Sequence, residues 1–158
     1  MNLREIVKYD PETGCFSWLI SGKGIRQGYP CGAITTQGYH RIKIQQREYL
    51  AHRLAWFFMT GSWPDGEIDH INMDKADNRW INLRDATTKQ NQYNRTAPSN
   101  NTSGFKGVTW NKKCKKWQSS IGYEGRYVYL GLFDCPAAAH FAYVIGADKH
   151  HGMFARSS

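Results

Sequence analysis

The sequence predicts an α+β fold that is divided between two modules and built from antiparallel strands with few helices. Residues 39–44 have a period of two, with odd positions on one face and even positions on the other, as in a β-strand. Short stretches between residues 105 and 133 predict three further strands separated by polar turns. Helical features at residues 49–60 and 136–148 complete the prediction.

The first module is expected to consist mainly of short hairpins followed by one helix, because turn-forming residues separate its apolar stretches. The Gly that follows the helix is a common helix-ending residue. In chain order, the expected elements are a helical turn at Leu3–Val7, a hairpin around Asp10–Gly14, a strand at Cys15–Ile20, a hairpin over Ala33–Ile44 with Gln37 and Gly38 at its tip, and a helix over Tyr49–Thr60 that stops at Gly61.

A polar stretch separates this part of the chain from the second module. Residues 94–103 carry no aliphatic side chain larger than Ala and are rich in turn formers, a composition typical of a linker. We therefore expect domains at residues 1–94 and 104–158, joined by a linker over residues 95–103. In the second domain, Cys135 and Pro136 should open a helix that runs to about Asp148, since Pro is favoured at an early helical position.

The net charge of +8 is distributed unevenly along the chain. Residues 1–93 carry 12 Lys and Arg against 10 Asp and Glu, whereas residues 94–158 carry 9 against 3. The basic excess lies beside many aromatic residues, a combination that suits a polyanionic partner such as nucleic acid. A basic face that is simply solvated is the alternative interpretation.

The composition disfavours several classes of protein. The longest apolar run, Leu54–Met59, is far shorter than the roughly 20 residues that span a bilayer, and the N-terminus has no signal-peptide pattern. We therefore expect a cytoplasmic protein with no membrane association, and nothing in the sequence indicates a protein partner. The four cysteines are widely spaced and form no CxxC pair, so we expect packing thiols and no zinc site.

One stretch of the first module carries residue types that suit hydrolytic chemistry. Asp69 and His70 close a short strand-like segment, and Asn82 follows in a turn rich in Asp and Asn. Asn91 lies in a helix-compatible stretch that begins near Thr88. Hydrolysis of a phosphodiester requires an activated water, neutralised phosphate charge and a stabilised leaving oxygen. An imidazole with nearby oxygen ligands for a hard cation can meet these needs.

The spacing of these residues resembles the signature of the HNH (ββα-metal) nucleases, in particular the phage and intron-encoded homing endonucleases. The segments AHRLAW at residues 51–56 and DNRWINLR at residues 77–84 are similar to the same family. The resemblance covers residues 1–94. It implies a ββα-metal nuclease core with an N-terminal β extension and a metal-dependent DNA endonuclease activity.

The resemblance also implies a role for each residue of the motif. His70 would be the general base, and Asn82 would fix its orientation. Asp69 and Asn91 would hold one divalent cation, Mg²⁺ or Mn²⁺, through oxygen atoms. Neighbouring side chains of an ideal strand point to opposite faces, and the family's distorted hairpin is expected to bring Asp69 and His70 together.

Several nearby positions allow two interpretations. Asn78 competes with Asn82 for the middle position of the motif, and we interpret Asn78 as a turn residue. His52 could touch phosphate or be a buried, hydrogen-bonded packing residue. Arg53 and Arg79 are candidate contacts to the DNA backbone, although exposed arginines are commonly just solvated.

The second module carries the segments GFKGVTW, KKWQSSIG and YVYLGLFD, followed by the Ala-rich AAAHFAY, within residues 104–152. These segments are similar to the APETALA-type (ethylene-response factor) DNA-binding domain. The resemblance implies a three-stranded antiparallel sheet that is backed by one helix and lies in the major groove. Plant members bring several Arg to this sheet face, whereas Thr109 and Gly122 occupy two such positions here. We therefore expect only a modest sequence preference.

A period of two divides the predicted strands of this module between two faces. We expect the helix to cover Val108, Trp117, Ser119, Ile121, Leu130 and Phe133. The opposite face, with Lys106 on the first strand, and the first turn should contact phosphates and base edges. The predicted DNA-binding residues of this module are Lys106, Thr109, Lys112, Lys113, Lys115, Gln118, Ser120, Arg126, Tyr127 and Tyr129.

Together these patterns predict an enzyme that cleaves double-stranded DNA, of the phage homing type and with modest sequence specificity. A catalytically inactive DNA-binding regulator on the same scaffold is the alternative, and a nuclease directed at RNA is another. The intact set of Asp69, His70, Asn82 and Asn91 favours the active enzyme.

Overall fold

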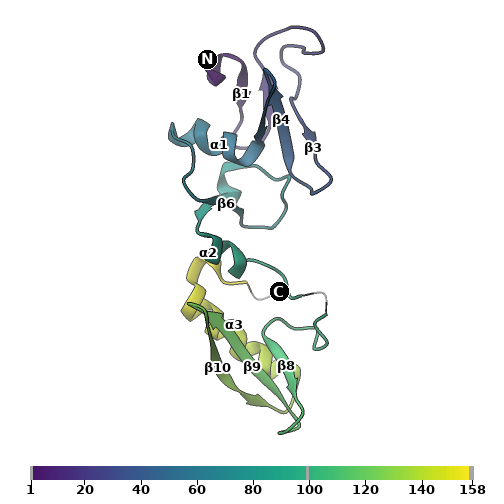
Figure 1. The fold of residues 1–158 in the computed structure, drawn as a ribbon, viewed down its shortest axis with the longest axis vertical. Coiled ribbons are helices and arrows are strands. Elements are labelled where there is room, and N and C mark those ends of the chain that lie inside the picture. Colours follow the sequence, from purple (N-terminus) through teal and green to yellow (C-terminus); the bar gives the residue numbers. More distant parts are fainter. Residues whose placement is uncertain (1, 99, 157–158) are drawn as a thin grey trace. The chain divides into compact units, whose positions relative to one another are not determined.

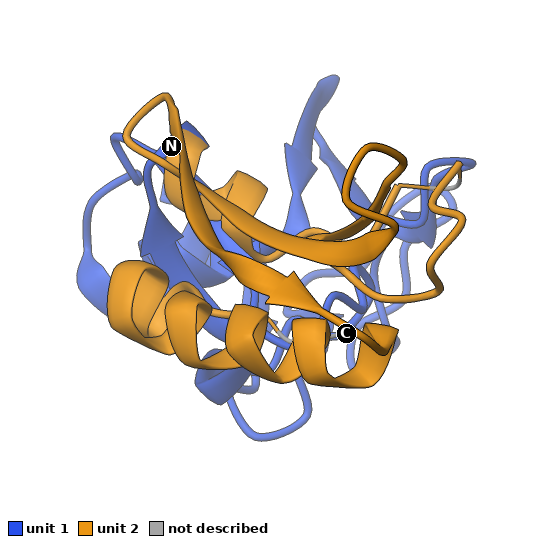
Figure 2. Ribbon diagram, turned by 90° about the horizontal axis from the view of Figure 1, so that it is seen from below, with its two compact units in different colours: residues 1–88 blue, residues 89–158 orange. Residues whose placement is uncertain are grey.

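A computed structural model of the protein describes residues 2–98 and 100–156 (Figure 1). The chain divides into two compact units, which we name unit 1 (residues 1–88) and unit 2 (residues 89–158) (Figure 2). The division falls within the short helix α2 (Thr88–Tyr93), so most of this helix belongs to unit 2.

Unit 1 consists of short antiparallel hairpins and one longer helix, as the sequence predicts. Its strands form a β1–β2 pair, a three-stranded β3-β4-β5 sheet and a β6–β7 pair. The elements are η1 (Leu3–Glu5), β1 (Val7–Tyr9), β2 (Phe16–Trp18), β3 (Ala33–Ile34), β4 (His40–Ile44), β5 (Arg47–Leu50), α1 (Ala51–Thr60), β6 (Glu67–His70), η2 (Trp80–Asn82) and β7 (Leu83–Ala86).

The core of unit 1 lies where α1 packs on the β3-β4-β5 sheet (Figure 1). Leu54 is fully buried there, together with Ile42 and with Val7 from the N-terminal hairpin. The helix ends as predicted, because Gly61 adopts a left-handed conformation and its N–H bonds to the carbonyl of Phe57 at 2.9 Å.

The start of this helix was predicted two residues too early. Tyr49 and Leu50 belong to β5, a strand that was not predicted, and they pair with Ile42 and Arg41 of β4. The ladder to β4 satisfies the backbone groups of this segment, so it stays extended until Ala51.

Unit 2 has the predicted three strands and one helix. Its antiparallel sheet has the order β10-β9-β8, and α3 runs along one face of it (Figure 2). The elements are β8 (Val108–Asn111), β9 (Lys116–Tyr123), β10 (Arg126–Phe133), α3 (Pro136–His151) and η3 (Gly152–Phe154).

Helix α3 extends about one turn beyond its predicted end at Asp148. The reason is a buried stripe with a spacing of four residues, Ala139, Tyr143, Ala147 and His151, which continues to the last residue of the helix. Tyr143 packs so closely on the turn before β8 that a Cβ at Gly107 would lie 1.9 Å from its ring, which explains the Gly at that position.

The predicted division of the sheet into two faces is confirmed for its core positions. Val108, Ser119 and Ile121 are buried, and Ile121 packs against α3. A β-bulge between Tyr129 and Gly131 changes the register of β10. The bulge allows Leu130 and Phe133, which are three residues apart, to lie on the same face.

Two other expectations can be compared with the structure. Cys31 is buried as a packing thiol, but the other three cysteines, Cys15, Cys114 and Cys135, are exposed, so the packing interpretation is wrong for them. Within residues 2–98 and 100–156, no helix has the length and apolar character needed to cross a membrane.

Candidate active site

The β6–β7 hairpin positions Asp69 and His70, which are each 5% exposed. Asp69 lies directly opposite Arg84 in the strand register. Its Oδ2 accepts hydrogen bonds from Nε of Arg84 at 2.8 Å and from Nη2 at 2.6 Å. The buried carboxylate is therefore held next to the positive charge of Arg84.

His70 contacts a different set of groups. Its Nε2 lies 3.5 Å from Oδ1 of Asn78. The ring of His52 meets it edge-on with centroids 5.0 Å apart, and the Tyr39 ring lies at 6.3 Å. Asp69 and His70 thus contact different groups, as strand alternation predicts, and β6 pairs with β7 in regular register from Glu67 to His70.

Burial controls the charge state of this imidazole. Burial lowers the pKa of His70 below its ordinary value, while the bond to Asn78 and the negative charge of Asp69 raise the pKa and oppose the shift. The net effect is a lowered pKa, so the ring is neutral at pH 7. A neutral imidazole is the form that can accept a proton.

His52 is buried on α1, as one of its two interpretations predicted. Burial lowers its pKa to about 3, with further contributions from His70 and Arg53, so it stays neutral. Its Nδ1 has no hydrogen-bond partner among the described residues, so the expectation that it is hydrogen-bonded is wrong for this atom. Tyr39 also contacts this ring, with centroids 5.4 Å apart.

Asn82 fastens the loop that follows His70. Its side-chain oxygen accepts a bond from the N–H of Asn72 at 2.9 Å, and its Nδ2 donates to the carbonyl of Asp77 at 2.8 Å. The two bonds reach both ends of this loop. Asn82 therefore orders the segment that leads to Asn78, the residue whose side chain lies next to His70.

The interpretation of Asn78 as a turn residue is incomplete. Its Nδ2 does donate to the carbonyl of Ala76 at 2.8 Å, as in a turn, but its Oδ1 faces the imidazole of His70. The side chain is 1% exposed. The sequence did not predict this placement, because Asn78 and Asn82 both lie in a segment rich in turn formers.

The N-terminal hairpin supports the same loop. The hydroxyl of Tyr9 donates to the carbonyl of Asn78 at 2.7 Å, and the N–H of Trp80 donates to the carbonyl of Pro11 at 2.9 Å. Gly14 has a φ of +73°, and a Cβ there would lie 2.5 Å from the backbone N of Arg79. The hairpin turn can approach the loop only because this residue lacks a side chain.

The last residue of the motif lies on a different unit. Asn91 is on α2, which begins where Thr88 Oγ1 donates to Glu67 Oε1 of β6 at 3.1 Å. Among the described residues, no three His, Cys, Asp or Glu side chains come together in a way that could hold a metal ion. A carboxylate with an amide oxygen, the donors of Asp69 and Asn91, nevertheless has the chemistry that Mg²⁺ and Mn²⁺ prefer.

The two arginines proposed as DNA contacts in unit 1 already have protein partners. Arg53 donates to the carbonyls of Gly66 and Pro64, both at 2.9 Å, and so ties α1 to the segment before β6. Arg79 donates to Asp77 through Nε and Nη2, and these bonds lower the pKa of Asp77 to about 2. Arg79 also lines a surface groove with Arg84 and Ile81.

Most of the predicted DNA-binding residues of unit 2 are at the surface. Gln118 and Ser120 are half-buried, and Gln118 accepts a bond from Asn111 Nδ2 at 2.9 Å. The exposed residues are Thr109, Lys112, Lys113, Lys115, Arg126, Tyr127 and Tyr129.

Lys106 is placed differently from the prediction. It lies before β8, which begins at Val108, and not on the first strand. Its ammonium donates to the carbonyls of Tyr93 at 2.8 Å and Arg95 at 2.6 Å. Strand alternation could not reveal this, because one partner carbonyl lies before the predicted linker and the other at its first residue.

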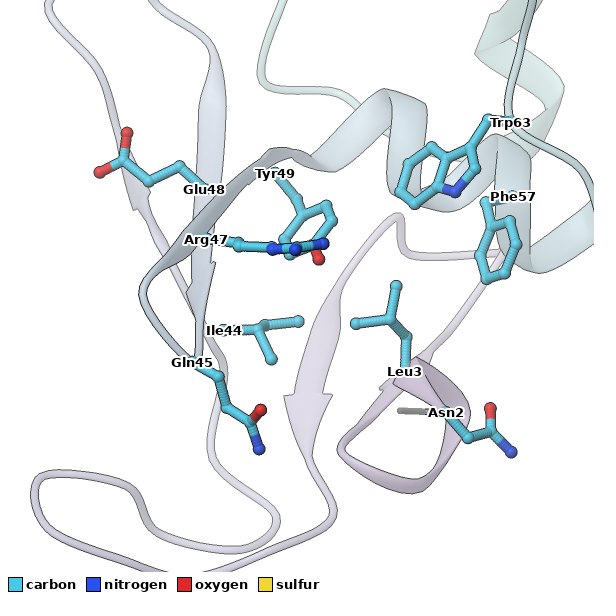
Figure 3. Close-up of a pocket in the computed structure, with 9 residues that line it drawn as sticks. All are labelled: Asn2, Leu3, Ile44, Gln45, Arg47, Glu48, Tyr49, Phe57 and Trp63. Carbon is cyan, nitrogen blue, oxygen red and sulfur yellow. The ribbon is translucent and has the colours of Figure 1, made fainter.

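A cavity in unit 1 lies apart from these residues (Figure 3). Trp63 stacks with Tyr49 and with Phe57 along its wall, at centroid distances of 5.7 and 4.8 Å. No residue predicted for the active site lines this cavity, whose lining residues are Asn2, Leu3, Ile44, Gln45, Arg47, Glu48, Tyr49, Phe57 and Trp63.

The sequence contained a signal for one of the residues that were missed. Once β6 and β7 are predicted to pair, Arg84 falls opposite Asp69, and opposite charges are favoured at such cross-strand positions. Tyr39 and His52 reach His70 through tertiary packing, for which residue spacing gives no signal.

Comparison with known proteins places the chain in a family. A profile of the HNH endonuclease family matches residues 49–93. Protein 3.8 of Escherichia phage T7 is 33% identical over 106 residues, which cover 66% of this chain and 87% of that protein. APETALA2-like protein 2 of Oryza sativa is 39% identical over 59 residues, which are 37% of this chain but 14% of the plant protein.

Among solved structures, that of the HNH homing endonuclease I-HmuI, described as binding and cleaving DNA, is similar over 92% of this chain and 85% of the other, with a TM-score of 0.45 and 21% identity. The relationship to Protein 3.8, together with the profile match, establishes the family. The chain belongs to the family of phage Protein 3.8 and carries an HNH endonuclease domain at residues 49–93.

Proposed function

We propose that the protein is a metal-dependent endonuclease that hydrolyses double-stranded DNA, with His70 as its general base. The observation that carries the proposal is the buried, neutral imidazole of His70, which lies next to Asn78 within the residues that match the HNH family. A homing-type enzyme encoded by a phage, acting in the host cytoplasm, fits the relationship to a phage protein.

The proposed reaction uses His70 to activate water. With the ring proton on Nε2 donated to Oδ1 of Asn78, the lone pair of Nδ1 accepts a proton from a water molecule. The water oxygen forms a bond to phosphorus, and the bond between phosphorus and the 3′ oxygen breaks. The products are a 5′ phosphate and a 3′ hydroxyl, which takes its proton from solvent. His52 and Tyr39 pack on the ring and limit its rotation.

HNH endonucleases generally use a divalent metal ion. We propose that Asp69 and Asn91 hold a single Mg²⁺ or Mn²⁺ ion here, which would neutralise charge on the phosphate and on the leaving oxygen. Arg84 orients the Asp69 carboxylate through its two bonds to Oδ2. Asn82 acts on the base indirectly. It orders the loop that carries Asn78, and Asn78 contacts His70.

We further propose that unit 2 is an APETALA-type module that anchors the enzyme on duplex DNA. The exposed lysines Lys112, Lys113 and Lys115 would contact phosphates, together with Arg126. On the sheet face, Tyr127, Tyr129, Thr109, Gln118 and Ser120 would read base edges. In unit 1, Arg79 and Arg53 remain weaker candidates for phosphate contact, because their guanidinium groups already bond within the protein.

The test is to incubate the pure full-length protein with phage or host DNA in Mg²⁺, in Mn²⁺ and in a chelator, and to map any breaks and their end groups. We expect breaks with 5′ phosphates in either metal and none in the chelator. Cleavage that persists in the chelator would refute the metal dependence. Tight DNA binding without breaks in any metal would favour the inactive regulator, and cleavage of RNA duplexes alone would favour the RNA nuclease.

A further inference from the structure

Helix α2 is too short to hold its own position. It has six residues, and none of them is buried. Isolated helices shorter than about 12 residues are marginal in water, and most helices in proteins are stabilised by burying one face. Contacts at the two ends of α2 therefore help to fix the position of Asn91. Thr88 supplies one of these at the start of the helix, where it donates to Glu67.

Lys106 provides a contact at the other end. Its ammonium donates to the carbonyl of Tyr93, the last residue of α2, and to that of Arg95. The final carbonyls of a helix lack partners within the helix and carry its partial negative charge, so a cation is favoured there. Burial lowers the pKa of Lys106 to about 8, with a further contribution from Arg156, and the ammonium is still charged at pH 7.

The side chain of Tyr93 is held by a second contact. Its ring stacks on His151 with centroids 3.7 Å apart and an interplanar angle of 5°. His151 is itself fixed, because it is buried and its Nε2 lies 2.8 Å from the carbonyl of Gly122 on β9. The end of α2 is thus attached to the sheet and to the last turn of α3.

We propose that Lys106 and His151 form a clamp by which the DNA-binding unit positions Asn91 for metal binding and cleavage. The clamp consists of the Lys106 bonds to the two carbonyls and the Tyr93–His151 stack. These residues are positioning residues, since they act through α2 and touch neither DNA nor metal. The proposal rests on the proposed function, in which Asn91 is a metal ligand. It gives Lys106 a different role from the phosphate or base contact that the sequence suggested.

The test compares full-length Lys106→Met with Lys106→Arg and with the parent. Lys106→Met removes the donors, whereas Lys106→Arg keeps a cation that can bond to two carbonyls. Lys149→Met is the matched control, because Lys149 is an exposed lysine of the same unit that has no part in the clamp. Four quantities are measured: Mn²⁺ affinity by calorimetry, DNA affinity in a chelator, the cleavage rate at saturating DNA, and the unfolding temperature.

We expect Lys106→Met to lower both Mn²⁺ affinity and the saturating cleavage rate by about 10- to 100-fold, the range found for residues that orient metal ligands. DNA affinity in the chelator should stay within about twofold of the parent, because phosphate contacts dominate it. Lys106→Arg should recover most of the loss, and Lys149→Met should behave as the parent. If Lys106→Met does not fold, Tyr93→Leu, which removes only the stack, should show the same pattern.

Two results would overturn the clamp. One is a Lys106→Met protein that binds DNA more weakly but cleaves at the parental rate when saturated, which would make Lys106 a phosphate contact. The other is parental Mn²⁺ affinity and cleavage in both Lys106→Met and Tyr93→Leu. Asn91→Ala separates these outcomes from a failure of the proposed function. If Asn91→Ala loses metal and activity while the clamp variants do not, the function stands and the clamp is wrong.

Discussion

The loop beside His70 and the helix that carries Asn91 are held in opposite ways. The loop is fastened along its length, by Asn82 at both ends and by Tyr9 at the carbonyl of Asn78. Helix α2 buries none of its six residues and is held at its ends. The proposed base therefore depends on the loop of unit 1, while the proposed amide ligand depends on a contact at each end of α2, with Glu67 at its start and Lys106 at its end. Substitutions should therefore affect the proposed base and the proposed amide ligand separately.

The largest expected effect comes from the base itself. His70→Ala should lower the cleavage rate by about 10²- to 10⁴-fold, because a general base acts in the transition state, and should leave DNA affinity within about twofold. Single-turnover cleavage and equilibrium binding measure the two effects. His150→Ala, which changes a half-buried histidine of unit 2, is the control. Comparable cleavage by His70→Ala and the parent would remove His70 from the mechanism.

A second large effect is expected at Asp69. Asp69→Ala should abolish Mn²⁺ binding and cleavage, since the anionic oxygen dominates attraction for a hard cation. It should also lower the free energy of unfolding by about 3–5 kcal/mol, because Arg84 would be left buried without its partner. Adding Arg84→Met should restore much of the stability but not Mn²⁺ binding. Calorimetry that gives unchanged Mn²⁺ affinity in Asp69→Ala would place the ligands elsewhere.

The support of the loop by the N-terminal hairpin can be broken at Gly14. Gly14→Ala should lower the free energy of unfolding by about 3–5 kcal/mol, through backbone strain and a clash with Arg79. Gly24→Ala is the control, because its φ of +74° is nearly the same but its Cβ would meet nothing within 4 Å. It should cost only the strain, about 1–2 kcal/mol. Equal unfolding free energies for the two variants would show that the close contact at Gly14 contributes nothing.

The smallest effects are expected on the surface of unit 2. Lys112→Ala and Lys113→Ala should each weaken binding to every duplex alike, and each lost phosphate contact should flatten the log–log salt dependence by roughly 0.9. Tyr129→Ala should instead change which sequences are preferred. Binding across a salt series measures the first effect and competition between duplexes the second. An unchanged salt dependence in both lysine variants would show that these lysines are simply solvated and contact no phosphate.

The sequence predicted helix ends and strand positions well where residue type and alternation determine them. The helix stop at Gly61 and the three strands of unit 2 follow from residue type and alternation. Strand β5 was not predicted, because the helical pattern of the sequence already begins at Tyr49 and competes with the pairing of β5 with β4. Such competition is decided by tertiary contacts.

The candidate site was predictable only in part, for a related reason. The positions of Asp69 and His70 on one strand follow from spacing and family resemblance. The carbonyls that hold Lys106 and the approach of Asn78 to His70 depend on how loops fold back on the chain. Backbone carbonyls exist at every residue, so no sequence pattern marks the ones that a lysine selects.

The most direct test compares His70→Ala with Asn91→Ala in one preparation, with Mn²⁺ affinity by calorimetry, DNA affinity in a chelator and cleavage of one duplex measured for each. The account predicts that His70→Ala binds Mn²⁺ and DNA as the parent does and fails to cleave, because only the base is lost. Asn91→Ala should bind DNA normally but lose both Mn²⁺ affinity and cleavage. Cleavage by His70→Ala, or parental Mn²⁺ affinity in Asn91→Ala, would contradict the proposed roles of His70 as base and Asn91 as metal ligand.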